Sequence, residues 1–300
     1  MAEYQLRAQT ILYKNDLNAV KKSVVSIANA VKNSVSANGY INKVQIAFGD
    51  ASPEAIVDDV FIDNLNEEFG NYINITYDFF GFNSGTSKGQ NILFKECDTE
   101  YLMVYNPDIV VAPDYFITMM EHYISDNSGK IGMVEARQTP IEHPKSYNPT
   151  TLEELWGAMA CVIIPSEVYR ELGGLDEDNF FMYCDDVDFS WRVRLSGRKI
   201  KYSPNSPVFH GHRLDSFGKL VASEAEKYYS AESALLMAYK WSNEKRLKYL
   251  ISVCSNGDKY QRKALEYFNK RKKEGTLPKQ LDKNHKIASF TADGYSQNRY

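Results

Sequence analysis

The sequence YLMVYNPD (residues 101–108) consists of apolar and aromatic residues up to Tyr105, followed by Asn106, Pro107 and Asp108. A short apolar run that is stopped by turn-forming residues is typical of a strand buried on both faces of a sheet. We therefore predict a central strand here. Asp108 would follow its carboxyl end, where a rigid element holds the carboxylate in place.

Strands and helices are predicted to alternate on both sides of this stretch. Leu17, Val20, Val24, Ile27 and Val31 recur at helical spacing, and Asn15 or Asp16 can cap that helix at its start. Pro113 is expected to open another helix. Alternation of this kind predicts an α/β fold with a mostly parallel sheet flanked by helices. Further strands are predicted at residues 5–13, 43–48, 72–77, 131–135 and 157–164.

The second half of the chain has a different pattern. A loop is predicted over 137–155, a short helix over 165–172, and a helix that begins near Asp185 and ends at Gly197. Asp185 and Asp188 have the spacing of a capping box for that helix. A short strand (IKYSP) then precedes a predicted turn at residues 205–207. Beyond His212 the pattern is helical to Lys273, so we predict a catalytic domain at 1–215 and a helical C-terminal extension at 216–300.

The composition is that of an ordinary soluble protein. Hydrophobic residues make up 43% of the chain, charged residues 25%, and the formal net charge is −4, which gives no indication of nucleic-acid binding. The four cysteines form no CxxC pair and are predicted to be buried apolar residues of a protein in a reducing compartment. The first residues lack the pattern of a signal peptide, and no apolar run approaches a membrane span. These features predict a cytoplasmic protein and leave its oligomeric state, monomer or homo-oligomer, open.

Three groups of residues have the chemistry of a metal and acid–base site. Asp108 offers the oxygen ligand that a divalent cation prefers, although Asn, Pro and Asp also form ordinary turns. The segment CDDVD (residues 184–188) carries more acid than a helix cap requires, and Asp186 is the carboxylate that a cap does not explain. His210 follows the last predicted strand and is a candidate ligand, although a single histidine is more often structural.

The segment from Asn83 to Asn91 is rich in Gly, Ser and Asn and leads into a predicted short helix. Backbone N–H groups of such a loop can hold a phosphate. The segment is neither a GxGxxG motif nor a Walker loop, so a plain surface loop is an equally good interpretation from the residues alone.

The order of these motifs is more specific than any one of them. The chain runs from NSGTSKGQN (residues 83–91) through NPD (106–108) and GGLDEDNFFMYCDDVDFSWRVRLSGRKIKYSP (173–204) to His210. In this order it resembles the inverting family-2 glycosyltransferases of the Rossmann-like GT-A fold, particularly bacterial rhamnosyl- and galactofuranosyl-transferases. The resemblance covers residues 5–213.

The resemblance implies a role for each matching position. Asp108 and His210 would hold Mn²⁺ or Mg²⁺, and Asp186 would be the catalytic base. One position departs from the family pattern: an Asp-Asn pair usually follows the second strand, whereas here Asp50 is followed by Ala51 and Ser52. Nucleotide-sugar contacts are expected from Tyr13, Asn15, Asp50, Asn83, Lys88, Asn91 and Asn106. Acceptor-side positions are expected at Trp156, Gly173, Gly174 and Asp185.

The implied function is transfer of a sugar from a UDP- or dTDP-linked donor to a glycan, glycolipid or protein acceptor in the synthesis of bacterial surface glycans. A metal-dependent phosphohydrolase or nucleotidyltransferase would use similar residues, with Asp114 as a second acid near Asp108. A catalytically silent protein that binds sugar nucleotides is the third alternative.

Basic residues outnumber acids between Lys259 and Lys286, and an apolar stripe there has helical spacing (Tyr260, Ala264, Tyr267, Phe268). A basic amphipathic helix can make peripheral contact with a membrane. The favoured interpretation is that the stripe packs on the rest of the protein and that the lysines face solvent.

Overall fold

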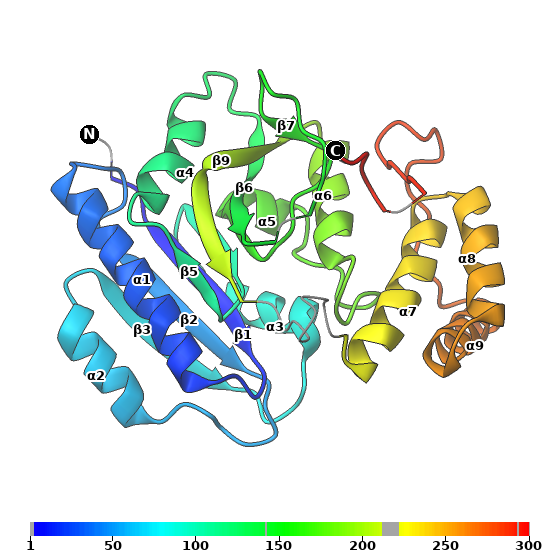
Figure 1. Cartoon of the computed structure of the whole chain (residues 1–300), viewed down its shortest axis with the longest axis horizontal. Helices are drawn as coiled ribbons and strands as arrows, with labels where there is room; N and C mark the ends of the chain where they lie inside the picture. Colours follow the sequence, from blue (N-terminus) through cyan, green and yellow to red (C-terminus); the bar gives the residue numbers. More distant parts are fainter. Residues whose placement is uncertain (1–2, 142, 212–221, 293, 300) are drawn as a thin grey trace.

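A computed structural model of the chain describes residues 3–141, 143–211, 222–292 and 294–299. Its centre is a nine-stranded mixed sheet covered by helices (Figure 1). Four neighbouring strands at one side of the sheet are parallel, which confirms the predicted α/β class. From that edge the order is β3 (Ile73–Phe79), β2 (Val44–Asp50), β1 (Leu6–Leu12), β4 (Tyr101–Tyr105), β8 (Cys161–Pro165), β6 (Ile131–Thr139), β9 (Lys199–His210) and β5 (Ile109–Val111), with β7 (Glu153–Glu154) paired to β9.

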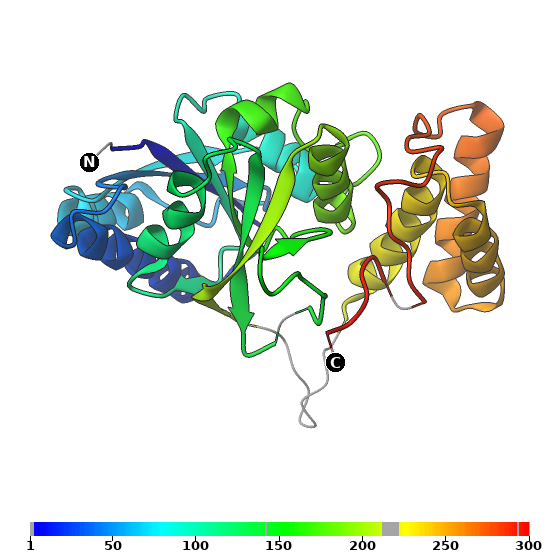
Figure 2. The same cartoon turned by 90° about the horizontal axis from the view of Figure 1, so that it is seen from above.

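Strand β4 is buried on both faces, as its apolar run predicts. Met103 and Tyr105 belong to the core under α1 (Leu17–Ser36), α2 (Asp59–Phe69) and α4 (Tyr115–Ile124). Leu102 and Val104 belong to the core under α5 (Ser166–Glu171) and α6 (Asp185–Leu195). Figure 2 shows the sheet between these two layers of helices. Each fully buried side chain of this kind contributes roughly 1.5–3 kcal/mol.

Two local predictions about helices are tested by the structure. The side chain of Asp16 accepts a hydrogen bond from the backbone N–H of Asn18 and caps α1, which confirms the predicted start of that helix. The segment from Asn83 to Asn91, which was expected to lead into a short helix, is itself mostly helical, because α3 (Gly85–Phe94) already begins at Gly85. Helix α2 was not predicted.

The predicted turn at residues 205–207 is wrong, because β9 runs without a break from Lys199 to His210. Its pairing with β6 shifts there: Ala136 opposes Ser203, whereas the next residue, Arg137, opposes Pro207. The three residues between them bulge out of the ladder, which is where a strand tolerates proline.

The capping box predicted for α6 is also wrong. The N-cap residue is Cys184, whose side chain makes no capping hydrogen bond, and the N–H of Val187 donates to Oδ1 of Asp186 at 2.8 Å. Asp188, the predicted second member of the box, is fully buried and turned toward other partners.

The C-terminal extension is helical, as predicted, with α7 (Glu224–Lys240), α8 (Glu244–Asn256) and α9 (Lys259–Glu274). Ala264 and Phe268 of the apolar stripe are buried in a core that also contains Trp191 of α6 and Trp241. Tyr267 of the same stripe is exposed and Tyr260 is half-buried, so the favoured interpretation of the stripe as core is confirmed for Ala264 and Phe268. The predicted boundary at 215/216 lies outside the described residues. Within the described ranges, no helix combines the length and the apolar character needed to cross a membrane.

Candidate active site

The carboxyl ends of β1 and β2 lie side by side, since Leu12 opposes Asp50 in their parallel ladder. The loops that follow are joined by a hydrogen bond of 2.8 Å from the backbone N–H of Lys14 to Oγ of Ser52. Tyr13 is exposed here, and the backbone N–H of Tyr13 donates to Oδ1 of Asn15 at 2.7 Å. The structure thus brings the predicted residues Tyr13, Asn15 and Asp50 to one edge of the sheet.

Asp50 is fully buried and its oxygens are engaged by the protein. Oδ1 accepts from the N–H of Ser52 at 2.8 Å, and Oδ2 accepts from the N–H of Ile56 at 2.9 Å and from the Tyr77 hydroxyl at 2.7 Å. Burial and this bond to Asp50 raise the pKa of Tyr77. The geometry therefore makes Asp50 a residue that shapes the loop after β2.

Asp108 and His210 meet at the end of β5 although they are far apart in the sequence. Ile109 opposes His210 in the antiparallel ladder of β5 and β9, so the preceding residue, Asp108, lies next to the imidazole. Oδ1 of Asp108 is 3.6 Å from Nε2 of His210. Nδ2 of Asn106 is 3.2 Å from the same nitrogen. All three predicted residues of this group are therefore together.

The imidazole of His210 is oriented by a residue that the sequence did not identify. Its Nδ1 lies 2.8 Å from Oε1 of Gln138, a buried side chain on β6. Because an amide oxygen only accepts, Nδ1–H donates to it, and in the neutral imidazole this directs the lone pair of Nε2 toward Asn106 and Asp108. A hydrogen bond of this kind on the second ring nitrogen is characteristic of metal-bound histidines. The residues present therefore fit a divalent cation.

The metal ligands from the protein are few. Among the residues that the structure describes, no three His, Cys, Asp or Glu side chains converge on a common point. A site with two protein ligands leaves coordination positions for substrate phosphates, which is how Mg²⁺ is commonly bound in phosphate-transferring enzymes.

The predicted base, Asp186, lies in the first turn of α6, after a strained turn. Tyr183 and Cys184 have left-handed backbones, with φ of 67° and 58°. Such strain in bulky residues is concentrated at functional sites. Burial, and then the charge of Asp185, raises the pKa of Asp186 to about 7. A carboxylate with this pKa can take up a proton near neutral pH.

Asp185 is directed toward the start of α3. Its Oδ2 lies 3.4 Å from Oγ of Ser87, and the backbone N–H of Thr86 donates to the carbonyl of Phe181 at 2.9 Å. Burial raises the pKa of Asp185 to about 6, against the lowering effect of its hydrogen bonds. These contacts bring the predicted phosphate segment next to the acidic pair. Asn83 and Lys88 are exposed at the same helix start.

A buried ion cluster that the sequence did not reveal lies behind the acidic pair. The ammonium of Lys145 contacts Glu135, lies 3.1 Å from Oε2 of Glu154, and sits 4.3 Å from the ring centroid of Trp156. Burial lowers the pKa of Lys145, but the two glutamates raise it by more than burial lowers it. The pKa therefore lies above its ordinary value, and the ammonium stays charged. Its positive charge lowers the pKa of Asp186 and opposes the effect of burial. Trp156, predicted on the acceptor side, is a buried part of this cluster.

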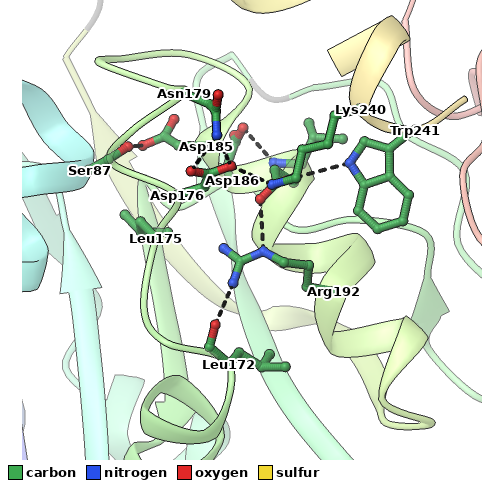
Figure 3. Close-up of polar contacts among 12 residues, drawn as sticks. Ser87, Leu172, Leu175, Asp176, Asn179, Asp185, Asp186, Arg192, Lys240 and Trp241 are labelled. Atoms are coloured by element: carbon green, nitrogen blue, oxygen red, sulfur yellow. Dashed lines mark hydrogen bonds and ion pairs between the residues drawn. The ribbon is translucent and has the colours of Figure 1, made fainter. Parts of the chain in front are cut away.

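The last acid of the CDDVD segment joins α6 to the extension. Asp188 accepts from Nε of Arg192 at 2.8 Å and from Nε1 of Trp241 at 3.0 Å, and it pairs with Lys240 at 2.6 Å. Lys240 also pairs with Asp176 at 2.6 Å. Figure 3 shows Lys240 and Trp241 reaching toward this part of α6.

The other predicted residues form a separate group. All four hydrogen-bonding positions of Asn91 are used by Tyr169, Leu175 and Glu177, which holds the loop that follows α5. Gly174 has a φ of 72°, and a Cβ there would collide with Oδ1 of Asn91. Gly173 and Gly174 line an open cavity of about 570 Å³ together with Asn91 and Arg192. Asp185 and Trp156 do not line it, so the four predicted acceptor-side residues do not form one surface.

Comparisons with known proteins agree with this architecture. No family model matches the chain. The chain is similar to rhamnosyltransferase WbbL of Escherichia coli K12, with 20% identity over 186 residues (52% of this chain and 64% of the relative). It is also similar to an N-acetylglucosaminyl-diphospho-decaprenol L-rhamnosyltransferase of Mycobacterium tuberculosis, with 30% identity over 76 residues (25% of this chain and 24% of the relative). Each match therefore spans less than two thirds of the curated relative.

Two solved structures share the fold. GalNAc-T7 with UDP, GalNAc and Mn²⁺ superposes with a TM-score of 0.62 at 12% identity, covering 92% of this chain and 56% of that one. The mannosyltransferase PcManGT from Pyrobaculum calidifontis, in complex with GDP-Man and Mn²⁺, has a TM-score of 0.56 at 12% identity, covering 91% and 83%. These likenesses confirm the fold predicted from the motif order, that of the GT-A glycosyltransferases. The resemblance to family-2 enzymes is borne out by the relatives named rhamnosyltransferases.

Proposed function

We propose that the protein is a metal-dependent, inverting glycosyltransferase that transfers a sugar from a UDP- or dTDP-linked donor to an acceptor hydroxyl. The observation that carries this proposal is the pair of Asp108 and His210 at the edge of a GT-A sheet, with Oδ1 of Asp108 3.6 Å from Nε2 of His210 and the other ring nitrogen held by Gln138. Solved structures of this fold contain nucleotides or nucleotide sugars with Mn²⁺.

In this proposal Asp108 and His210 would hold the cation together with the diphosphate of the donor. A bound Mn²⁺ or Mg²⁺ would act as a Lewis acid that neutralises charge on the leaving nucleoside diphosphate. The exposed ammonium of Lys88 and the first N–H groups of α3 add positive potential on the same side. Tyr13 and Asn15 are exposed enough to contact the nucleotide.

The chemical step uses Asp186. Its carboxylate takes the proton of the acceptor hydroxyl while that oxygen bonds to the anomeric carbon and the bond from this carbon to the diphosphate oxygen breaks. One displacement inverts the anomeric configuration. General-base assistance of this kind contributes roughly 10²–10⁴-fold to the rate. Lys145 and Asp185 act in opposite directions to hold the pKa of the base near neutrality.

The acceptor is proposed to be a glycan or a lipid-linked glycan of the bacterial surface, built on the cytoplasmic side. The name of the mycobacterial relative supports a lipid-linked acceptor, since it acts on a diphospho-decaprenol compound. A phosphohydrolase or nucleotidyltransferase with two metals is supported less well. Asp114 is exposed at the start of α4, and no cluster of three ligands occurs in the described ranges.

A thermal-shift screen of nucleotide sugars tests the proposal. A ligand that binds only the native state stabilises it by about 2.7 kcal/mol at 100 times its Kd. We expect one UDP- or dTDP-linked sugar to raise the Tm in Mn²⁺ and to lose this effect in EDTA. Equal stabilisation with and without metal would refute metal-dependent donor binding.

A further inference from the structure

The last described residues of the chain, 294–299, which we call the tail, return to the candidate active site. After α9 the chain runs back along the catalytic domain, where Nη1 of Arg194 reaches the carbonyl of Ile287 at 2.5 Å. Figure 1 shows the red segment after α9 running back from the helical extension toward the catalytic domain, where Phe290 packs edge-on against Trp191 of α6. The tail therefore ends on the catalytic domain.

The tail pairs with the segment that carries Lys145. The N–H of Ser146 donates to the carbonyl of Gln297 at 2.7 Å, and the N–H of Arg299 donates to the carbonyl of Pro144 at 2.8 Å. These bonds make Lys145 and Asn298 opposite one another in a short antiparallel bridge. The tail is thus held to the segment whose ammonium tunes the base.

The same tail contacts the turn before the acidic pair. The hydroxyl of Tyr295 lies 3.1 Å from Sγ of Cys184, and the phenol ring packs edge-on against Trp191 with centroids 5.7 Å apart. Burial is the largest influence that raises the pKa of both groups, so both stay protonated and a hydrogen bond between them persists at neutral pH. The negative charge of Asp186 also raises the pKa of the Tyr295 hydroxyl.

The turn needs such support because its backbone is strained. Left-handed conformations of Tyr183 and Cys184 persist only where the surroundings hold them. The contacts that hold the turn come largely from the C-terminal part of the chain. The hydroxyl of Tyr183 donates to Glu226 at 2.9 Å, Oγ of Ser233 donates to the carbonyl of Met182 at 3.0 Å, and Tyr295 contacts Cys184.

We propose that the tail completes the active site and that Tyr295 is a positioning residue, which keeps Asp186 aligned through the Tyr183–Cys184 turn. This inference rests on the proposed function for its catalytic readout only. A displacement of a catalytic group by about 1 Å can cost about 10²-fold in rate, even when the mutated residue is remote from the chemistry.

The test compares Tyr295→Phe with Tyr249→Phe, which removes a hydroxyl from an exposed ring on α8. Tyr295→Phe keeps the ring packing and removes only the contact with Cys184. We expect kcat to fall about 10- to 100-fold with the KM for the donor almost unchanged, since the donor loops are not touched. Removing residues 294–300 should lower kcat at least as much, and Tyr249→Phe should behave as the wild type.

Hydrogen exchange over residues 181–187 provides a readout that needs no substrate. It should be faster in Tyr295→Phe than in the wild type and in Tyr249→Phe, whether or not a donor has been identified. If the proposed function is wrong, the wild type will not transfer a sugar, but the faster exchange in Tyr295→Phe will still be observed. Unchanged exchange, or a fall in kcat matched by an equal rise in the donor KM, would overturn the positioning role.

Discussion

Asp186 starts α6 beside a second carboxylate, and this proximity sets its chemistry. Asp186→Asn should leave the fold and donor binding nearly intact and reduce kcat by at least about 10²-fold, because the amide cannot accept the proton. Asp185→Asn should have a smaller effect, since Asp185 is engaged with Ser87. Steady-state kinetics and donor binding of the two variants test this. Wild-type turnover in Asp186→Asn would show that the base is another group.

The raised pKa of Asp186 also predicts the pH dependence of the same rate. A general base works in its deprotonated form, so kcat/KM should rise with pH through about 7 and then level off. An unperturbed aspartate would give this rise near pH 4. Because Asp185 and Asp186 interact, the apparent value belongs to the pair. A profile that is flat from pH 5 to 8 would contradict the role of a buried carboxylate.

Gln138 is expected to matter for metal binding although it is not a ligand. Gln138→Leu removes the acceptor for Nδ1–H of His210 and leaves the ring free to change tautomer. Loss of such a partner typically lowers metal affinity by roughly 10–100-fold. The metal affinity is measured from the Mn²⁺ concentration at which the donor reaches half of its stabilising effect on the Tm. His285→Asn, which changes an exposed histidine, is the control. An unchanged Mn²⁺ midpoint in Gln138→Leu would contradict the role of His210 as a metal ligand.

At the scale of these residues, sequence identified the chemical groups but not all of their partners. Asp108 and His210 were predicted as metal ligands and Asn106 as a nucleotide-sugar contact, and the structure brings the three together where β5 pairs with β9. Gln138, Lys145 and Tyr295 were missed because each reaches the site only through long-range contacts. Asn91 and Asp50 were assigned to the nucleotide from motif order, whereas their hydrogen-bonding groups are engaged within the protein.

At the scale of elements, Asp188 decides how α6 is held. Loss of a helix cap costs about 1 kcal/mol, whereas breaking a buried ion pair costs about 3–5 kcal/mol. Asp188→Ala should therefore lower the free energy of unfolding by about 3 kcal/mol or more, because Lys240 and Trp241 lose a buried partner. Asp258→Ala, which removes the true side-chain cap of α9, is the control. If urea unfolding gave similarly small losses in the free energy of unfolding for the two variants, the role of Asp188 as a buried partner of Lys240 and Trp241 would be contradicted.

The errors at this scale have local physical causes. Residues 205–207 are turn formers, and Asn205 and Ser206 do leave the ladder, but the pairing of β9 resumes at Pro207 on the other side of the bulge. The spacing of Asp185 and Asp188 fits a capping box, but burial of Asp188 against Lys240 is a tertiary effect that spacing does not contain. In both cases the local residue types located the irregular segment correctly, and tertiary packing determined which structure it adopts.

At the scale of the whole molecule, the extension and the catalytic domain share one core. Phe180 and Trp191 pack with Leu236, Trp241 and Phe268, so the helices after β9 cover apolar surface of the domain before it. The sequence predicted helices here from periodicity and predicted that their stripe is buried. It could not show that the same helices, with the tail, support the turn before Asp186.

The most direct test of the central claim is product formation by the full chain. The protein is incubated with the nucleotide sugar that stabilises it, a glycan or lipid-linked acceptor and Mn²⁺, and the glycosylated product and its anomeric configuration are measured. We predict an inverted glycosidic linkage whose formation stops in EDTA, resumes when Mn²⁺ is restored, and falls at least about 10²-fold in Asp186→Asn. Full transfer in EDTA, or a product that retains the configuration of the donor, would contradict the mechanism.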